Sequence, residues 1–364
     1  MIDSHVHTRD FKEAKKETIE HAIWVAYRAG FDGIYAEPNT KPSITIREIV
    51  VEVMSIANKV IRQIEQKGGK FFYGQFVGLT TEPDQVKRAV DIVREFFPIN
   101  GDERVGIVGL KEYAGQSTND LTVGKIDQQR RNKQILVKKG YEYVQKEHCE
   151  RDDLMRAELW DPSNPITHSL VRNKETEIQS VRDQIDLCLE TGYALVGSSG
   201  RLHLVHLTTP EAIDLVQDYR DKLNITCAVR PLDLLLNNTV MNQEDGMMYK
   251  VNPPLRDEGT RRKNFGRYKA GMVDILESDH APHNFKDKTE RYASGIPILA
   301  RWQRLISELI ARGVSSELIN ETMHYKVNKI FGTKIPQSGR PLKTVQEDVG
   351  WYASDPTKYL SVVE

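Results

Sequence analysis

The first nine residues bring together side chains that can bind a metal ion. Asp3, His5, His7 and Arg9 occur in the run DSHVHTR, with single residues between the two histidines and between His7 and Arg9. Alternate residues of an extended strand point to the same face, so His5 and His7 would lie side by side with Arg9 continuing the line. Two imidazoles on one face can hold one metal ion. Such a pair alone more often makes local hydrogen bonds, so the rest of the chain has to support it.

Four further candidate ligands stand where predicted strands end. Lys111 ends a strand expected at 104–110, His148 follows one at 141–144, His206 ends one at 202–206, and Asp279 follows one at 272–277. Barrel enzymes assemble their chemistry at the C-terminal ends of their strands. The positions therefore predict a shared site.

Strand-like and helix-like patterns alternate along the chain. The other strands are expected at 2–8, 31–36, 70–77 and 225–229, and helices at 12–29, 46–67, 84–97, 126–137 and 210–219. Repeated βα units predict a parallel sheet, and eight strands over this length favour an α/β fold of the (β/α)₈ TIM-type barrel, with an open doubly wound sheet as the alternative. We expect the barrel over 1–336 and a short C-terminal appendage packed on it over 337–364.

Composition indicates a small-molecule partner. The 364 residues include 51 Lys and Arg against 52 Asp and Glu, so nothing points to nucleic acid or an anionic membrane. Three widely spaced cysteines, Cys149, Cys188 and Cys227, argue for a reducing compartment. Neither a signal-peptide pattern nor a long apolar stretch is evident, so the expected location is cytoplasmic.

Several motifs together resemble one known family. In order they are DSHVHTR, KET at 16–18, EPNTKP, GLKEYAG, EHCE, HLVHLTTPEA, KVNPPLR and ESDHAPH. The combination is similar to the dihydroorotases of the amidohydrolase superfamily. This resemblance implies a metal-dependent barrel that reversibly hydrolyses the cyclic amide of L-dihydroorotate to N-carbamoyl-L-aspartate in pyrimidine biosynthesis.

The resemblance also implies a site with two zinc ions. Six residues would be ligands: His5, His7 and Asp279 on one ion, His148 and His206 on the other, and Lys111, carboxylated on its amine, on both. A carbamate is an anion with two oxygens, which suits a bridge between two cations. Asp279 would act as general base and acid, taking the proton of a metal-bridging hydroxide and passing it to the leaving nitrogen.

Substrate contacts follow from the same resemblance. Arg9, Asn39 and His283 would bind the carboxylate of a small anionic substrate, and Asn252 the ring amides. Partners beyond the substrate would be a second copy of the chain or a carbamoyltransferase. The alternatives are a hydantoinase-like or allantoinase-like cyclic amidohydrolase and a catalytically silent homologue that serves as a scaffold for a carbamoyltransferase.

Other features fall outside this pattern. Many dihydroorotases have Thr-Pro-x-His where this chain has Arg230-Pro231-Leu232-Asp233, which changes the expected ring pocket and adds a charge near its mouth. An unmodified Lys111 would need a buried partner such as Glu112 or Glu150. Long irregular regions at 155–171 and 240–262 are candidates for closing over substrate. Four histidines, His21, His168, His203 and His324, are expected to make local hydrogen bonds or to lie at the surface, with the alternative that His168 lines the site. His280 is expected to be structural.

Overall fold

Eight parallel strands follow one another around a barrel in sequence order. The computed structural model describes residues 1–98, 103–116, 121–346 and 352–360. The strands are β1 (Ile2–Val6), β2 (Gly33–Ala36), β3 (Phe72–Gly78), β4 (Val105–Tyr113), β5 (Val144–His148), β6 (Arg201–Leu204), β7 (Ile225–Val229) and β8 (Ile275–Leu276). A parallel bridge between Val6 and His280 brings the end of β1 to the segment after β8. The predicted (β/α)₈ barrel is confirmed, with the ring nearly closed.

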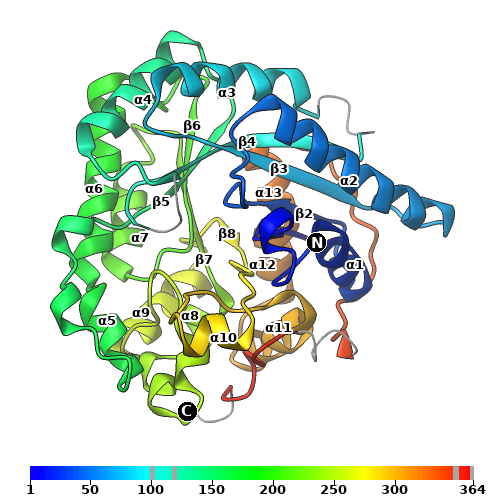
Figure 1. Ribbon diagram of the computed structural model, residues 1–364. Helices are drawn as coiled ribbons and strands as arrows, with labels where there is room; N and C mark the ends of the chain where they lie inside the picture. The colour runs from blue at the N-terminus through cyan, green and yellow to red at the C-terminus, as the bar shows by residue number, and fades with distance from the viewer. Residues whose placement is uncertain (99–102, 117–120, 347–351, 361–364) are drawn as a thin grey trace.

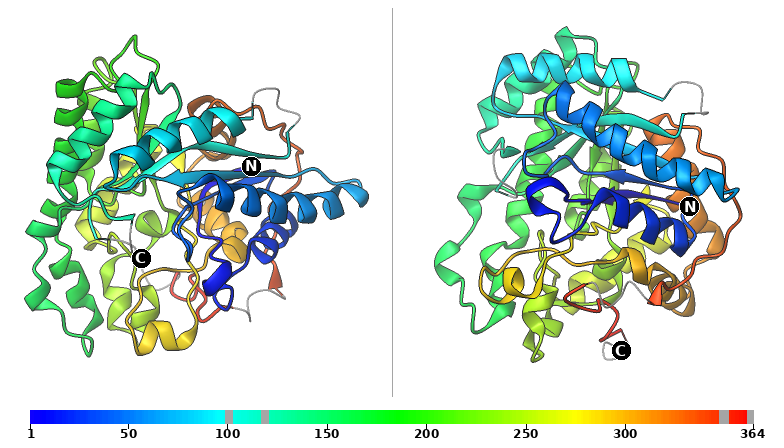
Figure 2. Two further views of the ribbon diagram at one scale, coloured as in Figure 1. Left: turned by 45° about the horizontal axis from the view of Figure 1, so that its top comes forward. Right: turned by 45° about the vertical axis from the view of Figure 1, so that its right-hand side comes forward.

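Most helices cover the outside of the strands (Figures 1 and 2). The helices are α1 (Ile19–Ala29), α2 (Arg47–Gln66), α3 (Pro83–Phe96), α4 (Ile126–Lys138), α5 (His168–Val171), α6 (Lys174–Thr191), α7 (Pro210–Asp218), α8 (Pro231–Leu235), α9 (Glu258–Lys269), α10 (Phe285–Thr289), α11 (Trp302–Ala311), α12 (Ser316–Asn320) and α13 (Lys326–Phe331). Local signals set their ends. In α1, the Thr18 hydroxyl accepts from the His21 amide at the start, and Gly30 ends the helix at φ 99°.

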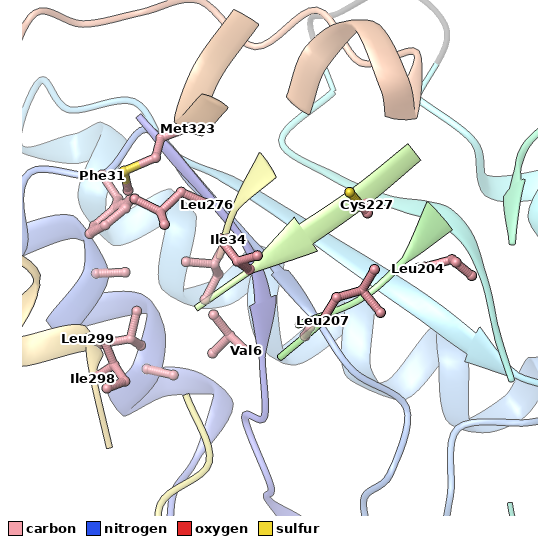
Figure 3. Packing of buried hydrophobic residues seen from close by; sticks show 14 of the residues in the cluster. Val6, Phe31, Ile34, Leu204, Leu207, Cys227, Leu276, Ile298, Leu299 and Met323 are labelled. Atoms are coloured by element: carbon pink, nitrogen blue, oxygen red, sulfur yellow. The ribbon is translucent and has the colours of Figure 1, made fainter. Parts of the chain in front are cut away.

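Apolar side chains pack on both sides of the strands. Between strands and helices, Leu276 lies near Phe31 and Met323, and Val6 belongs to the same large cluster (Figure 3). Inside the barrel, Phe331 of α13 packs against Tyr35 and Phe76, with ring centroids 5.2 and 5.7 Å apart. Rings from β2, β3 and α13 thus fill the interior below the strand ends, which leaves the C-terminal ends to carry polar groups.

Some elements differ from the sequence-based expectation. β5 begins at Val144, where the predicted strand ended, and α6 was not predicted. The region 155–171 contains short helical turns, and α9 begins inside the second region expected to be irregular. The first predicted helix begins only at Ile19, because Phe11–Glu13 forms a separate 3₁₀ turn.

The described part of the C-terminal segment lies against the barrel. The Lys343 amide donates to the carbonyl of Ala29, and Arg301 pairs with Asp355 at 2.7 Å. Residues 347–351 and 361–364 of the predicted appendage lie outside the described residues. The assignment of 337–364 as an appendage separate from a 1–336 barrel stays a prediction. Within the described ranges, every helix is too short or too polar to cross a lipid bilayer.

Candidate metal centre and substrate cavity

Most predicted site residues surround one cavity of about 500 Å³. Nine of the ten contribute to its lining: His5, His7, Arg9, Asn39, His148, His206, Asn252, Asp279 and His283. They come from the ends of strands or from the loops that follow, far apart in sequence. The tenth, Lys111, is fully buried and does not line the cavity.

His5, His7 and Asp279 form a compact group of possible metal ligands. One ligand atom from each lies within 4.8 Å of the others. Asp279 Oδ1 is 3.1 Å from His7 Nε2 and 3.5 Å from His5 Nε2. Burial lowers the pKa of His5 well below its usual value, which favours the neutral imidazole that can ligate a metal. The donors therefore fit a divalent cation such as zinc.

Asp279 is held as a carboxylate despite its burial. Burial acts to raise its pKa, but the hydrogen bond with His7 and the charge of Arg230 help to hold the pKa well below its usual range. Nη1 of Arg230 donates to Asp279 Oδ2 at 3.1 Å. One oxygen of Asp279 thus faces the histidines and the other faces an arginine.

His148 and His206 form a second pair at the cavity. His148 Nδ1 lies 3.2 Å from His206 Nε2. Glu150 accepts a hydrogen bond from His148 Nε2 at 3.0 Å and also pairs with Arg172. Glu150 thereby fixes the orientation of the His148 imidazole. His206 Nδ1 has no hydrogen-bond partner among the described residues, and burial lowers the pKa of its ring well below the usual value. A neutral buried imidazole with an unused nitrogen is suited to bind a cation.

Lys111 is a buried amine without a hydrogen bond among the described residues. Its Nζ lies 3.4 Å from Glu37 Oε2. The expected partners were wrong, because Glu112 bonds to Asn132 and Glu150 to His148 instead. Burial lowers the pKa of Lys111, although the charge of Glu37 opposes the shift.

A bulge in β4 precedes Lys111. Gln75 of β3 pairs with Ile107 and Phe76 with Gly109, so Val108 is an extra residue in β4. A Cβ on Gly109 would stand 2.4 Å from the carbonyl oxygen of Val144, so only glycine fits there. The bulge therefore sets the register of the residues that follow it, including Lys111.

The predicted substrate residues are held by specific neighbours. Asn39 Oδ1 lies 2.5 Å from His7 Nδ1, so this side chain touches a candidate ligand as well as the cavity. Arg9 Nη2 is 3.3 Å from His283 Nε2, and Arg9 Nε is buried without a hydrogen bond among the described residues. Arg9 thus retains a donor for an anion.

Backbone strain is concentrated at this site. Arg9, His206 and Asp279 adopt φ angles of 51°, 35° and 52°. Residues other than glycine seldom take this left-handed conformation, and such residues cluster at functional sites. All three line the cavity.

Sequence reasoning missed a group of buried charges beside and below the cavity. Arg230 was expected near the mouth but is 2% exposed and lies behind Asp279, where Asp233 pairs with it at 2.7 Å. Lys146, Glu37 and Glu277 are fully buried around His5. Their one sequence signal was charge at or just after the ends of predicted strands.

The remaining histidines make local contacts. His168 Nε2 bonds to Asn252 Oδ1 at 2.9 Å, next to the cavity. The others pair elsewhere: His21 with Glu17, His203 with Thr226, His280 with the Ile298 amide, and His324 with Asn328.

Known proteins resemble this chain in both sequence and fold. A dihydroorotase of Brevibacillus brevis is 30% identical over 297 residues, which are 79% of this chain and 61% of the relative. One of Methanosphaera stadtmanae is 26% identical over 367 positions, covering 96% of this chain and 74% of the relative. The chain thus spans about three fifths of the first relative and three quarters of the second. No model of a known protein family matches the chain.

Solved structures share the barrel. An L-hydantoinase (dihydropyrimidinase) of Arthrobacter aurescens superposes with a TM-score of 0.77 at 19% identity, covering 94% of this chain and 73% of its own. A dihydroorotase of Saccharomyces cerevisiae in complex with 5-fluoroorotic acid gives a TM-score of 0.68 at 16% identity, covering 92% and 85%. The chain shares its barrel fold with both structures. In sequence it is a homologue of the dihydroorotases, which are members of the amidohydrolase superfamily.

Proposed function

We propose that the protein is a dihydroorotase that opens the cyclic amide of L-dihydroorotate and closes N-carbamoyl-L-aspartate. The observation that carries this proposal is the convergence of His5, His7 and Asp279 on one cavity with Arg9. The first three suit a metal ion and the fourth a carboxylate. The dihydroorotase relatives support the same substrate.

The site would hold two zinc ions. His5, His7 and Asp279 would bind one, His148 and His206 the other, and Lys111, carboxylated on its amine, both. The lowered pKa of the buried Lys111 amine supports this, because only a neutral amine reacts with carbon dioxide. Divalent ions, when bound, would activate water and polarise the amide carbonyl.

The charge of the cavity favours an anionic substrate. Its charged lining includes five Lys and Arg residues, Arg9, Lys16, Lys41, Arg172 and Arg291, against two acids, Glu13 and Asp279. The guanidinium of Arg9 would hold the substrate carboxylate by paired hydrogen bonds, with Asn39 and His283 beside it. Asn252 would bind the ring amides.

Asp279 would move the proton between water and the ring nitrogen. With Oδ1 facing the two histidines, Oδ2 would accept the proton of the attacking hydroxide and give it to the leaving nitrogen. Arg230 donates to the same Oδ2 and stabilises the ionised carboxylate. This contact favours release of the proton to the nitrogen once Asp279 has taken it.

The cellular setting follows from the same proposal. We place the protein in the cytoplasm, supported by the three cysteines, which are all free and buried. A second copy of the chain and a carbamoyltransferase are the proposed protein partners.

A substrate panel tests the proposal against a hydantoinase-like or allantoinase-like activity. The zinc-loaded protein is assayed with L-dihydroorotate, hydantoin and allantoin, and then as Arg9→Ala, with the exposed surface variant Arg47→Ala as a matched control. We expect turnover of dihydroorotate, lost in Arg9→Ala and retained in Arg47→Ala. Preferred turnover of hydantoin or allantoin would overturn the proposed substrate. A protein that binds no zinc when zinc is supplied, and turns over none of the three compounds, would favour the scaffold alternative.

A further inference from the structure

One buried carboxylate touches two of the candidate metal ligands. Glu277 lies between β8 and Asp279 and is fully buried. Its Oε1 is 3.2 Å from His5 Nδ1 and accepts from the His206 backbone amide at 3.1 Å. Its Oε2 accepts from the Ser4 hydroxyl at 3.0 Å. A single side chain thus joins strand β1 to the segment after β6.

The contact with Glu277 defines which nitrogen of His5 is available. A carboxylate only accepts hydrogen bonds, so His5 Nδ1 must carry the hydrogen that is shared with Oε1. Nε2 is then unprotonated in the neutral ring. It is also the nitrogen that faces Asp279 at 3.5 Å, on the side of the other candidate ligands. The tautomer selected by Glu277 is the one that can bind a cation there.

Lys146 lies below Glu277 and holds it in place. Its ammonium bonds to Glu37 Oε1 at 2.6 Å and to the Ser4 carbonyl at 2.9 Å, and lies 3.7 Å from Glu277 Oε2. Lys146 and both glutamates are fully buried. A cation between two carboxylates reduces the cost of burying them.

We propose that Glu277, held by Lys146 and Ser4, is a positioning residue of the metal centre. It fixes the ring of His5 with Nε2 toward the cation and fixes the backbone that carries His206. Because these two histidines belong to different ions in the proposed function, Glu277 couples the two halves of the centre. The inference rests on the metal binding of the proposed function and is independent of the substrate.

The test measures zinc affinity and does not depend on turnover. Purified Glu277→Leu and Glu277→Gln are dialysed against graded concentrations of free zinc, and bound zinc is measured by atomic absorption. Asp274→Asn is the matched control, because Asp274 is also a buried acid that accepts a backbone amide, that of Cys227, near the start of β8. Circular dichroism checks that each variant is folded.

Loss of an outer-sphere partner typically weakens metal binding by about 10- to 100-fold, and we expect this loss in Glu277→Leu. Glu277→Gln keeps an acceptor oxygen of similar reach, so its loss should be smaller but measurable, and it remains informative if the leucine variant does not fold. Asp274→Asn should bind zinc as the wild type does. The inference would be overturned if folded Glu277→Leu bound zinc with an affinity within twofold of the wild type. If Glu277→Leu does not fold, the same result in Glu277→Gln would overturn it.

A second readout needs no metal. In protein labelled with ¹⁵N at histidine, NMR should show the imidazole of His5 protonated at Nδ1. The signal of His5 is assigned as the one that is missing from the spectrum of His5→Gln. The signal should change in Glu277→Leu and persist in Asp274→Asn. A wild-type protein that shows this tautomer but binds no zinc would contradict the metal binding on which both proposals rest. A wild-type protein that binds zinc with His5 protonated at Nε2 would contradict only the positioning role.

Discussion

Nη1 of Arg230 donates to Oδ2 of Asp279 across 3.1 Å, while its Nε and Nη2 bond to the two oxygens of Asp233 at 2.7 and 2.8 Å. The guanidinium is 2% exposed and also donates to the Pro253 carbonyl at 2.8 Å. Arg230 therefore has a fixed position. It orients the carboxylate to which the proposed function assigns the proton.

Substitutions of Arg230 and Asp233 should distinguish the effect of Arg230 on activity from its effect on stability. Arg230→Met leaves Asp233 buried and unpaired, which should destabilise the fold by about 3–5 kcal/mol. The double variant Arg230→Met/Asp233→Leu removes both charges and should recover most of that stability. Its kcat should still fall by about 10- to 100-fold, because the free energy of one hydrogen bond to a charged group corresponds to a rate change of that size. Urea unfolding and steady-state kinetics measure the two effects.

The same double variant should change the pH profile. Arg230 is one of the charges that hold the pKa of Asp279 low, so its loss should raise that pKa. The acidic limb of kcat/KM should then move to higher pH, because Asp279 must be ionised to accept a proton. Superimposable acidic limbs in the two proteins would exclude an electrostatic role for Arg230.

Lys111→Ala should lose activity and part of its bound zinc, because the proposed carbamate supplies an oxygen to each ion. Acetate or propionate should restore part of the activity and part of the bound zinc, because its carboxylate can occupy the space left by the lysine side chain. The wild type with the same acids serves as control and should gain nothing. Full activity of Lys111→Ala without added acid would remove the carbamate from the proposal.

His168 should affect substrate binding through Asn252. Its Nε2 lies 2.9 Å from Asn252 Oδ1 and 3.1 Å from the Val251 carbonyl, so this nitrogen is the donor. That bond leaves the amide nitrogen of Asn252 for the substrate. His168→Ala should cost about 1 kcal/mol, or roughly a fivefold rise in KM. His203→Gln, a buried histidine bonded to Thr226 outside the cavity, should leave KM unchanged.

Lys250 should make stability depend on pH in the alkaline range. Burial, together with the charge of Arg172, lowers its pKa from 10.5 to about 7. The unfolded chain then binds more protons than the folded protein between pH 7 and 10.5, so the free energy of unfolding should rise with pH across this interval, by at most about 1.4 kcal/mol per unit. Below pH 7 both states are protonated and this dependence should disappear.

Lys250→Met should reduce this rise, since no proton is then lost on folding. Its gain in stability over the wild type should be largest at neutral pH and should vanish near pH 10.5. Urea titrations of both proteins at pH 7, 8, 9 and 10 provide the comparison. Parallel stability curves for the two proteins would show that Lys250 titrates normally in the folded state.

The sequence predicted the barrel because apolar strands alternate with amphipathic helices, and it placed His5 and His7 on one face because a strand repeats every two residues. It predicted β5 poorly. Gln145, Lys146 and Glu147 look like a loop, yet all three are fully buried in the strand. Lys146 pairs with Glu37 and Glu147 lies 3.6 Å from Lys133, both on other elements, and the Gln145 amide donates to Glu147. No local pattern records the first two contacts.

The buried charges around the site could not be predicted for the same reason. Glu37 was part of a motif and Arg230 a departure from one, but Glu37 finds its partner across the barrel and Arg230 finds one beyond the neighbouring strand β8. Lys146 meets Glu37 from 109 positions away, and Arg230 meets Asp279 from 49 positions away. Periodicity shows which face a residue occupies, whereas ion pairs within a closed barrel depend on strand register and bulges such as that at Val108.

The central claim is that these distant side chains form one hydrolytic site. The most direct test is turnover of L-dihydroorotate and N-carbamoyl-L-aspartate by the purified protein, after removal of metal with a chelator and again after addition of zinc. We predict no turnover without metal and interconversion of the two compounds once zinc is restored. A folded, zinc-loaded protein that converts neither compound would contradict the account.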